Sequence, residues 1–131
     1  MKIFISHASS DTWVARQIAE HIRRRGADTF LDVDQIPVGD DFRAHILDLE
    51  PDCAELLVLL TPWSMKRPWV LFELSCFIHA RKRVVCLLHG LTAEQAKDDP
   101  FIGVLMPRET FVDINAIDTY LDQIGKYIAA R

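Results

Sequence analysis

The sequence predicts an α/β fold in which a parallel β-sheet carries helices on both faces, and three observations support this prediction. Short runs of strand-forming residues alternate along the chain with segments whose apolar residues recur at helical spacing. One run, Glu55 to Leu60, is almost continuously apolar, as expected for a strand buried on both faces. The length of 131 residues fits one domain with a real core, so we expect a single domain over residues 1–131.

The first third of the chain is expected to hold two strands and one helix. A β-type run, Lys2 to Ser6, leads into a polar loop that ends at Asp11, a residue well suited to start a helix. Apolar residues then recur at helical spacing to about Arg25, and Gly26 is suited to end that helix. Thr29 to Asp32 is the predicted second strand.

The middle of the chain predicts a loop, two helices and the buried strand. Val33 to Gly39 carries the Pro and Gly punctuation of a loop, and a periodic segment runs from Asp40 to Leu49. Acidic residues at a helix start are favourable and need no other explanation. After the strand Glu55 to Leu60, a mostly apolar helix is predicted from about Pro68, a residue suited to a first helical turn, to Arg83.

The last third predicts two more strands and a terminal helix. Val84 to Leu88 is the fourth strand, and an irregular connection follows with one helical piece at Ala93 to Lys97. Glu109 to Asp113 is a weak fifth strand, and apolar residues from Ile117 to Ile128 mark the terminal helix.

Glu73 is the most informative residue of the predicted Pro68 helix. It lies one turn after Trp69 on the same helix face, with apolar residues around it. A carboxylate on a buried helix is costly unless it is paired or lies in a cleft. Glu73 is therefore either bound to a buried donor or a functional group.

Ligands of open α/β sheets lie beyond the carboxyl ends of the strands. Glu73 follows the third strand by a little over one helical turn, so it can face that same edge. The other residues expected there are Ser6 and His7, Asp32 to Gln35, Thr61 to Ser64, and His89.

Composition excludes several classes of function. The net charge of −4 argues against general nucleic-acid binding, and the two basic clusters, Arg23 to Arg25 and Arg81 to Arg83, fall at predicted helix ends that cations stabilise. The three cysteines are far apart in apolar sequence and are expected to be reduced thiols in a cytoplasmic protein. We expect no metal, because no ligand motif is present, and no signal peptide or membrane span.

Several familiar catalytic motifs are absent. No Gly-x-Gly-x-x-Gly or Gly-x-x-x-x-Gly-Lys follows the first strand, so neither a dinucleotide-binding turn nor a P-loop is predicted. A phosphoryl-accepting receiver domain would need acidic residues where Ser6, His7, Thr61 and Pro62 stand. Ser6 and His7 do not predict a nucleophile and its base, because neighbouring strand residues point to opposite faces.

Three segments together resemble the TIR family, the Toll and interleukin-receptor homology domain. The run from Ile3 to Asp11 resembles its opening box, and Phe30-Leu31-Asp32 with Asp34 to Gly39 resembles its second strand and BB loop. The segment from Trp69 to Glu73, with Ser64 before it, resembles the family's Trp-x-x-x-Glu motif. The likeness runs from Lys2 to about Leu88, and the last third matches only in outline.

The resemblance implies a flavodoxin-like sheet of order 2-1-3-4-5 and one of two functions. Many bacterial and plant TIR domains cleave NAD+ at the nicotinamide–ribose bond, to ADP-ribose or a cyclic product, and short ones occur in bacterial antiphage defence. Others are non-catalytic adaptors that associate with other TIR domains. We expect the NAD+-cleaving type, with NAD+ as substrate and no cofactor, and keep the interaction module as the alternative. An α/β domain that binds another nucleotide is a third interpretation.

The resemblance also assigns roles to residues. Glu73 maps onto the catalytic glutamate, Trp69 walls the pocket, and the loop after the second strand forms a lid that also mediates self-association. The predicted substrate-binding residues are Phe4, Ser6, His7, Asp34, Ser64 and Trp69. The predicted assembly loop comprises Val33, Ile36, Pro37, Val38 and Gly39, and we expect head-to-tail contacts with other TIR domains but no nucleic acid or membrane partner.

Overall fold

A computed structural model describes residues 1–31 and 42–130, and in this part of the chain five parallel strands form one sheet. The strand order is β2-β1-β3-β4-β5, so the predicted fold class is confirmed. The strands are β1 (Lys2–Ser6), β2 (Asp28–Leu31), β3 (Glu55–Leu60), β4 (Arg83–Leu88) and β5 (Phe111–Asp113).

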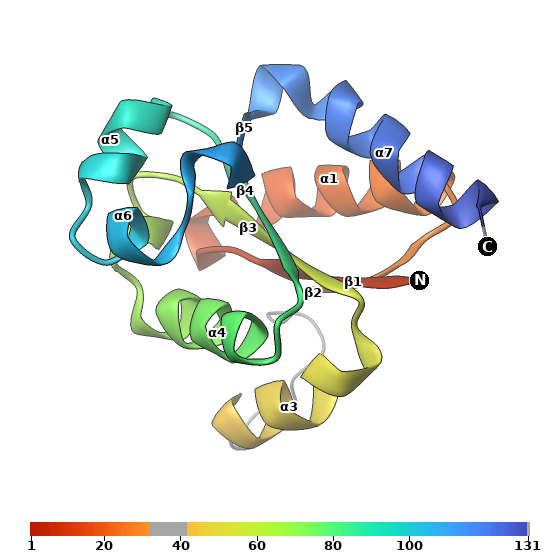
Figure 1. Ribbon diagram of the computed structural model, residues 1–131, viewed down its shortest axis with the longest axis horizontal. Coiled ribbons are helices and arrows are strands. Elements are labelled where there is room, and N and C mark those ends of the chain that lie inside the picture. Colours follow the sequence, from red (N-terminus) through yellow and green to blue (C-terminus); the bar gives the residue numbers. More distant parts are fainter. Residues whose placement is uncertain (32–41, 131) are drawn as a thin grey trace.

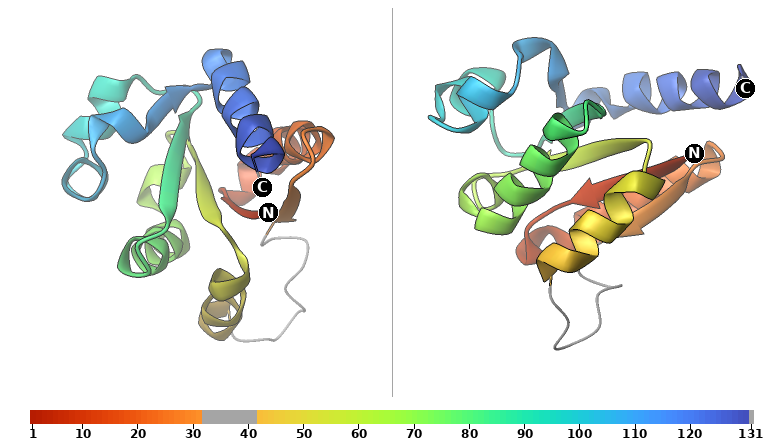
Figure 2. Two further views of the ribbon diagram at one scale, coloured as in Figure 1. Left: turned by 45° about the vertical axis from the view of Figure 1, so that its right-hand side comes forward. Right: turned by 60° about the horizontal axis from the view of Figure 1, so that its bottom comes forward.

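Helices cover both faces of this sheet (Figure 1). They are α1 (Thr12–Arg24), α3 (Phe42–Leu49), α4 (Pro68–His79), α5 (Ala93–Asp98), α6 (Ile102–Leu105) and α7 (Ile117–Ala129). The views of Figure 2 agree with Figure 1 that α1 and α7 lie on one face and α3 and α4 on the other. In Figure 1 the helices α5 and α6 stand at the left, where the central strands end.

The central strand β3 separates two hydrophobic cores. All its residues are buried, as its apolar sequence predicts. Leu56, Val58 and Leu60 belong to the core under α4, whereas Leu57 and Leu59 belong to the core under α1 and α7. Because side chains alternate along a strand, residues of β1 divide between the same two cores.

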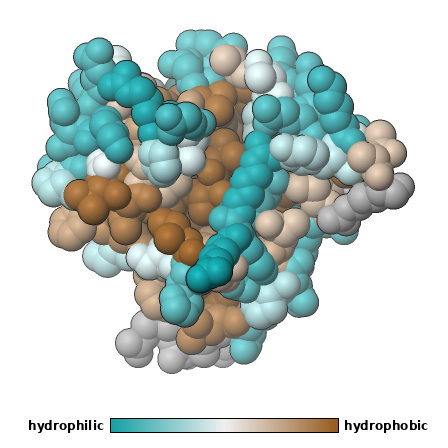
Figure 3. All heavy atoms as spheres, viewed as in Figure 1, coloured by the Kyte–Doolittle hydropathy of each residue, from teal (hydrophilic) through white to brown (hydrophobic). Residues whose placement is uncertain are grey.

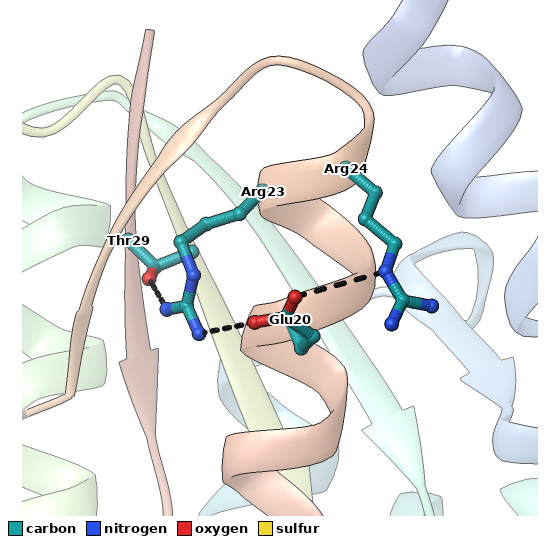
Figure 4. A network of polar contacts seen from close by, with 4 residues as sticks. All are labelled: Glu20, Arg23, Arg24 and Thr29. Carbon is teal, nitrogen blue, oxygen red and sulfur yellow. Dashed lines mark hydrogen bonds and ion pairs between the residues drawn. The ribbon is translucent and has the colours of Figure 1, made fainter.

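A polar network holds the end of α1 against the neighbouring strand (Figure 4). The guanidinium of Arg23 donates to Glu20 Oε2 at 2.9 Å and to Thr29 Oγ1 of β2 at 2.8 Å, and Arg24 lies 3.7 Å from Glu20 Oε1. Gly26 has φ +98°, a left-handed conformation that ends the helix as predicted. This basic cluster therefore serves the fold.

The second basic cluster differs from its prediction. The helix α4 ends at His79, earlier than expected, and Arg81 has a left-handed φ of 58°. The chain turns there. The Lys82 ammonium donates to the backbone oxygen of Glu50, to the Glu50 carboxylate at 3.0 Å and to Cys53 O at 2.7 Å. The backbone caps the helix here, because the Arg81 amide donates to Ile78 O and the Lys82 amide donates to Phe77 O, both at 3.0 Å.

Other element boundaries shift by a few residues. The second strand begins at Asp28, and the fifth is shorter than predicted because Arg108–Thr110 form a 3-10 turn. The short helix α6 was not predicted. Among the described residues, no helix is long and apolar enough to cross a membrane.

Candidate functional site

One aromatic contact joins α4 to the sheet, and a second joins two strands of the sheet beside it. The ring of Phe4, on β1, lies 5.0 Å from that of Phe30 on β2 and 5.6 Å from that of Phe77 on α4, centroid to centroid. Phe4 is fully buried, so the predicted substrate-binding residue is a member of the core under α4.

Glu73 and Ser6 lie closer to the carboxyl ends of the strands than Phe77 and Phe4 do. Ser6 follows Phe4 by two residues, about 6.6 Å along a strand, and Glu73 precedes Phe77 by one helical turn, about 6 Å along its axis. Since α4 runs back along the sheet, these steps point in the same direction. Both residues have no exposed surface. The helix α4 packs on β3 and β4 and reaches β1 through Phe77, so Glu73 lies toward the carboxyl ends of these strands.

Ser6 carries a polar side chain at the buried end of β1. Its hydroxyl is buried and has no hydrogen-bond partner among the described residues. A buried hydroxyl without a partner is costly, so such groups often mark a place where water or a ligand binds. Ser6 shares the sheet face of Phe4, and therefore the face covered by α4.

His7 directly follows Ser6 at the end of β1 and faces the layer of α1. It is fully buried, and its Nε2 is 3.4 Å from Thr12 Oγ1, in the first turn of α1. The Thr12 hydroxyl donates to Ser9 O at 2.7 Å, which holds it beside the histidine. Ser6 and His7 therefore face different layers, which agrees with the expectation that they are no nucleophile–base pair.

Ser64 shapes the connection from β3 to α4. Its hydroxyl donates to Leu59 O at 2.8 Å and accepts from the Thr61 amide at 2.9 Å, and the Ser64 amide donates to Thr61 Oγ1 at 3.1 Å. These bonds occupy the hydroxyl inside the turn, and a role for Ser64 in substrate binding stays a prediction.

The predicted Trp69 is half-buried at the start of α4, one turn before Glu73. Its ring packs against the core under α4, and the Arg67 guanidinium lies 5.5 Å from the ring centroid. The neighbouring Trp63 is 57% exposed, so packing does not account for its indole. The role of Trp69 as a wall of the substrate site stays a prediction.

The remaining predicted site residues lie outside the described part of the chain. These are Asp34, predicted to bind substrate, and the assembly loop of Val33, Ile36, Pro37, Val38 and Gly39.

The described residues hold no group of three or more His, Cys, Asp or Glu side chains able to bind a metal ion. The three cysteines are free thiols. Burial raises the pKa of Cys53 to about 11 and that of Cys86 to about 12, so both are inert thiols at neutral pH.

Asp11 and Thr61 were not predicted as partners. The Thr61 hydroxyl donates to Asp11 Oδ2 at 2.7 Å, and both residues are buried. Asp11 precedes α1, as predicted, but its side chain makes no helix-capping hydrogen bond. Polar residues directly after adjacent strands were a usable signal, because parallel strands end at the same edge.

The arrangement suits chemistry in which positive charge develops on a substrate. A carboxylate held away from water interacts strongly with such charge, because the surrounding dielectric is low.

Comparison with known proteins agrees with this layout. A family model described as a TIR domain matches residues 3–126. A curated relative from Bacteroides thetaiotaomicron, the 2' cyclic ADP-D-ribose synthase BtTIR, is 27% identical over 97 residues. That match covers 70% of this chain and 34% of the relative, so this chain corresponds to about a third of that protein's length.

Solved structures share the fold at low sequence identity. The TIR domain of the Toll-related receptor TRR-2 from Hydra magnipapillata has a TM-score of 0.67 at 19% identity, over 90% of this chain and 87% of that one. The TIR domains of the activated Roq1 resistosome give 0.66 at 14% identity, over 98% and 97%. The CMP N-glycosidase BcmB of Clostridium botulinum gives 0.61 at 13% identity, over 95% and 98%.

The family match covers nearly the whole chain, and the strand order and the Trp69–Glu73 helix agree with it. The chain belongs to the TIR domain family.

Proposed function

We propose that this TIR domain cleaves NAD+ at the bond between nicotinamide and ribose, with Glu73 as the catalytic residue. The observation that carries the proposal is the complete burial of Glu73 on α4, toward the carboxyl ends of the strands. A carboxylate held away from water interacts strongly with positive charge that develops on a bound substrate, because the surrounding dielectric is low.

The chemistry needs one well-placed negative charge. Cleavage breaks the bond between the nicotinamide nitrogen and the ribosyl C1′ carbon, and the bonding electrons leave with nicotinamide. Positive charge then spreads over C1′ and the ring oxygen, as in other glycosyl transfers. The Glu73 carboxylate stabilises that charge, and the Ser6 hydroxyl offers a hydrogen bond to the ribose. Because nicotinamide departs as a neutral molecule, no general acid is required.

The fate of C1′ distinguishes two products. Attack by water gives linear ADP-ribose, whereas attack by a hydroxyl of the same molecule gives a cyclic ADP-ribose. In both cases the attacking oxygen loses one proton as its bond to C1′ forms. The curated relative is a 2' cyclic ADP-D-ribose synthase, and this supports cyclisation as well as cleavage. Either product would serve as a signal in defence, which is the context that we propose for the activity.

The burial of Glu73 also suggests how the activity is held in check. With no exposed surface, its carboxylate is reached by NAD+ only when side chains over it move. We therefore propose that the dilute domain is weakly active and that self-association of TIR domains favours the open arrangement. A ligand or partner shifts such an equilibrium only through its different affinity for the two states.

The second candidate is a non-catalytic TIR interaction module, and one observation favours it. Apolar side chains on and beside α6 are exposed, with Val104 at 84% and Phe101 at 64%, and Leu105 lies next to them. Figure 3 shows apolar residues gathered on this side of the molecule, at the left. Exposed apolar groups of this kind mark interaction sites. They are equally compatible with an enzyme that self-associates.

Product analysis separates the candidates. The concentrated protein is incubated with NAD+, and nicotinamide, ADP-ribose and cyclic ADP-ribose are resolved by chromatography with mass detection. We expect nicotinamide together with one ADP-ribose product. A parallel incubation with CMP tests the activity named for the structural neighbour BcmB. NAD+ that stays intact at every protein concentration would favour the interaction module.

A further inference from the structure

A buried hydrogen bond joins the two chain segments that carry the proposed site. The Thr61 hydroxyl, directly after β3, donates to Asp11 Oδ2, just before α1, at 2.7 Å. Asp11 is 6% exposed and Thr61 is fully buried. One segment continues from Ser6 and His7 at the end of β1, and the other leads through Ser64 to α4.

Thr61 is held from both sides. Its hydroxyl accepts from the Ser64 amide at 3.1 Å while it donates to Asp11, and its own amide donates to Ser64 Oγ at 2.9 Å. Thr61 O accepts in turn from the Met65 amide at 3.2 Å. The turn that leads into α4 is therefore held together by Thr61, the residue that binds Asp11.

Asp11 is anchored independently on the β1 side. Its amide donates to Ala8 O at 2.9 Å in the 3-10 turn Ser9–Asp11, from which α1 continues. A hydrogen bond to a charged group is stronger than one between neutral groups, and it is directional. The bond therefore fixes how far the end of the β1 segment stands from the start of the α4 segment.

We propose that Asp11 and Thr61 are positioning residues, which set the placement of Ser6 relative to Glu73 by locking these two segments together. Neither residue touches substrate in this proposal. Small errors in the position of reacting groups reduce rates strongly, so a loosened lock lowers turnover in a protein that is still folded. The kinetic part of this inference rests on the proposed NAD+ cleavage.

The chain provides a matched control hydrogen bond at the other end of the sheet, where the strands begin. The Tyr120 hydroxyl, on α7, donates to Glu55 Oε2, at the start of β3, at 2.8 Å, and both residues are buried. It is likewise a buried hydroxyl-to-carboxylate bond over a long sequence separation. Its loss should cost stability without disturbing the proposed site.

The experiment compares Thr61→Val, Thr61→Ser and Tyr120→Phe. Thr61→Val keeps the shape of the side chain and removes the hydroxyl, and we expect kcat for NAD+ to fall by roughly 10-fold to 100-fold. The value of kcat/KM should fall by a similar factor, because the change acts on the transition state rather than on uniform binding. Thr61→Ser, which keeps the hydroxyl, should restore most of kcat. Tyr120→Phe should lower the melting temperature while kcat stays at the wild-type value.

A double variant tests whether the two residues act as a unit. Both Asp11→Ala and Thr61→Val remove the bond between the two residues, and Thr61→Val also removes the bond from the Ser64 amide to the Thr61 hydroxyl. The double variant should therefore lose no more kcat than Thr61→Val alone. Multiplicative losses, or a loss of kcat in Tyr120→Phe equal to that in Thr61→Val, would show general destabilisation and overturn the proposal.

Hydrogen exchange gives a readout that does not depend on activity. In Thr61→Val the Asp11 amide and the start of α1 should exchange faster, although the change is 50 residues away along the chain. Tyr120→Phe should leave that segment protected. If wild-type protein leaves NAD+ intact, the proposed function fails. The exchange result alone then decides whether the bond between Asp11 and Thr61 holds the two segments together. Unchanged exchange at residues 8–12 in Thr61→Val would refute it in either case.

Discussion

The ring of Phe4 on β1 lies 5.6 Å from the ring of Phe77 on α4, and this contact joins the helix that carries Glu73 to the sheet. Both rings are fully buried. Phe77→Ala should lower the free energy of unfolding by about 3–5 kcal/mol, measured by urea unfolding, because the cavity fills poorly. The matched control is Phe101→Ala, at an exposed phenylalanine, which should change stability little. Equal effects of the two substitutions would refute this role for Phe77.

Local patterns revealed the parts of the fold that depend on neighbours in sequence. The apolar run Glu55–Leu60 predicted β3 with its bounds, and Gly26 predicted the end of α1. The end of α4 was missed, because Arg81 rather than a glycine takes the left-handed conformation there, and Lys82 then binds the distant segment before β3. Contacts between distant segments have no local signature.

The same limit applies to the candidate site. Glu73 and Trp69 were identified because helical spacing and the family resemblance both pointed to them. The bond between Thr61 and Asp11 spans 50 residues of sequence, and Asp11 was interpreted only as a helix start. Ser6 was predicted at the strand end, but only the structure shows its buried hydroxyl without a partner among the described residues.

Trp69→Phe tests whether the indole has a specific role in the site. The substitution keeps an aromatic ring in a half-buried place, so stability should change little. We expect KM for NAD+ to rise, because a wall of the pocket becomes smaller. Activity is measured with the melting temperature alongside it. Normal kinetics at normal stability would show that the indole contributes nothing specific.

The pH dependence of stability should carry a signature of Glu55. Burial raises the pKa of this carboxyl above its ordinary value of 4.5, although its hydrogen bond from Tyr120 and the nearby Arg83 act in the opposite direction. The folded state thus holds the Glu55 proton to higher pH than the unfolded state does. As pH rises from 4.5 through the raised pKa, the folded state loses that stability.

The measurement is the difference in unfolding free energy between wild type and Glu55→Gln across this pH range. Wild type should lose stability relative to the variant as pH rises. A difference that stays flat, or that grows in favour of wild type, would contradict the raised pKa.

Specific activity should rise with protein concentration if self-association opens the site. Val104→Asp places a charge on the exposed apolar surface beside α6, so it should leave the melting temperature unchanged and weaken that rise. Gln17→Asp, at an exposed position of α1, is the matched control and should behave as wild type. Constant specific activity in a protein that light scattering shows to be monomeric throughout would argue against control by assembly.

The catalytic role of Glu73 is tested most directly by comparing the two buried glutamates, Glu73 and Glu55. Glu73→Gln and Glu55→Gln each replace one buried carboxyl group by an amide and keep the side-chain shape, at different positions in the fold. We predict that Glu73→Gln reduces NAD+ turnover by roughly 10²-fold or more, whereas Glu55→Gln retains it. Turnover is measured as nicotinamide released per protein at a concentration where wild type is active and both variants are folded. A folded Glu73→Gln protein that turns over NAD+ at the wild-type rate would contradict the proposed role of Glu73.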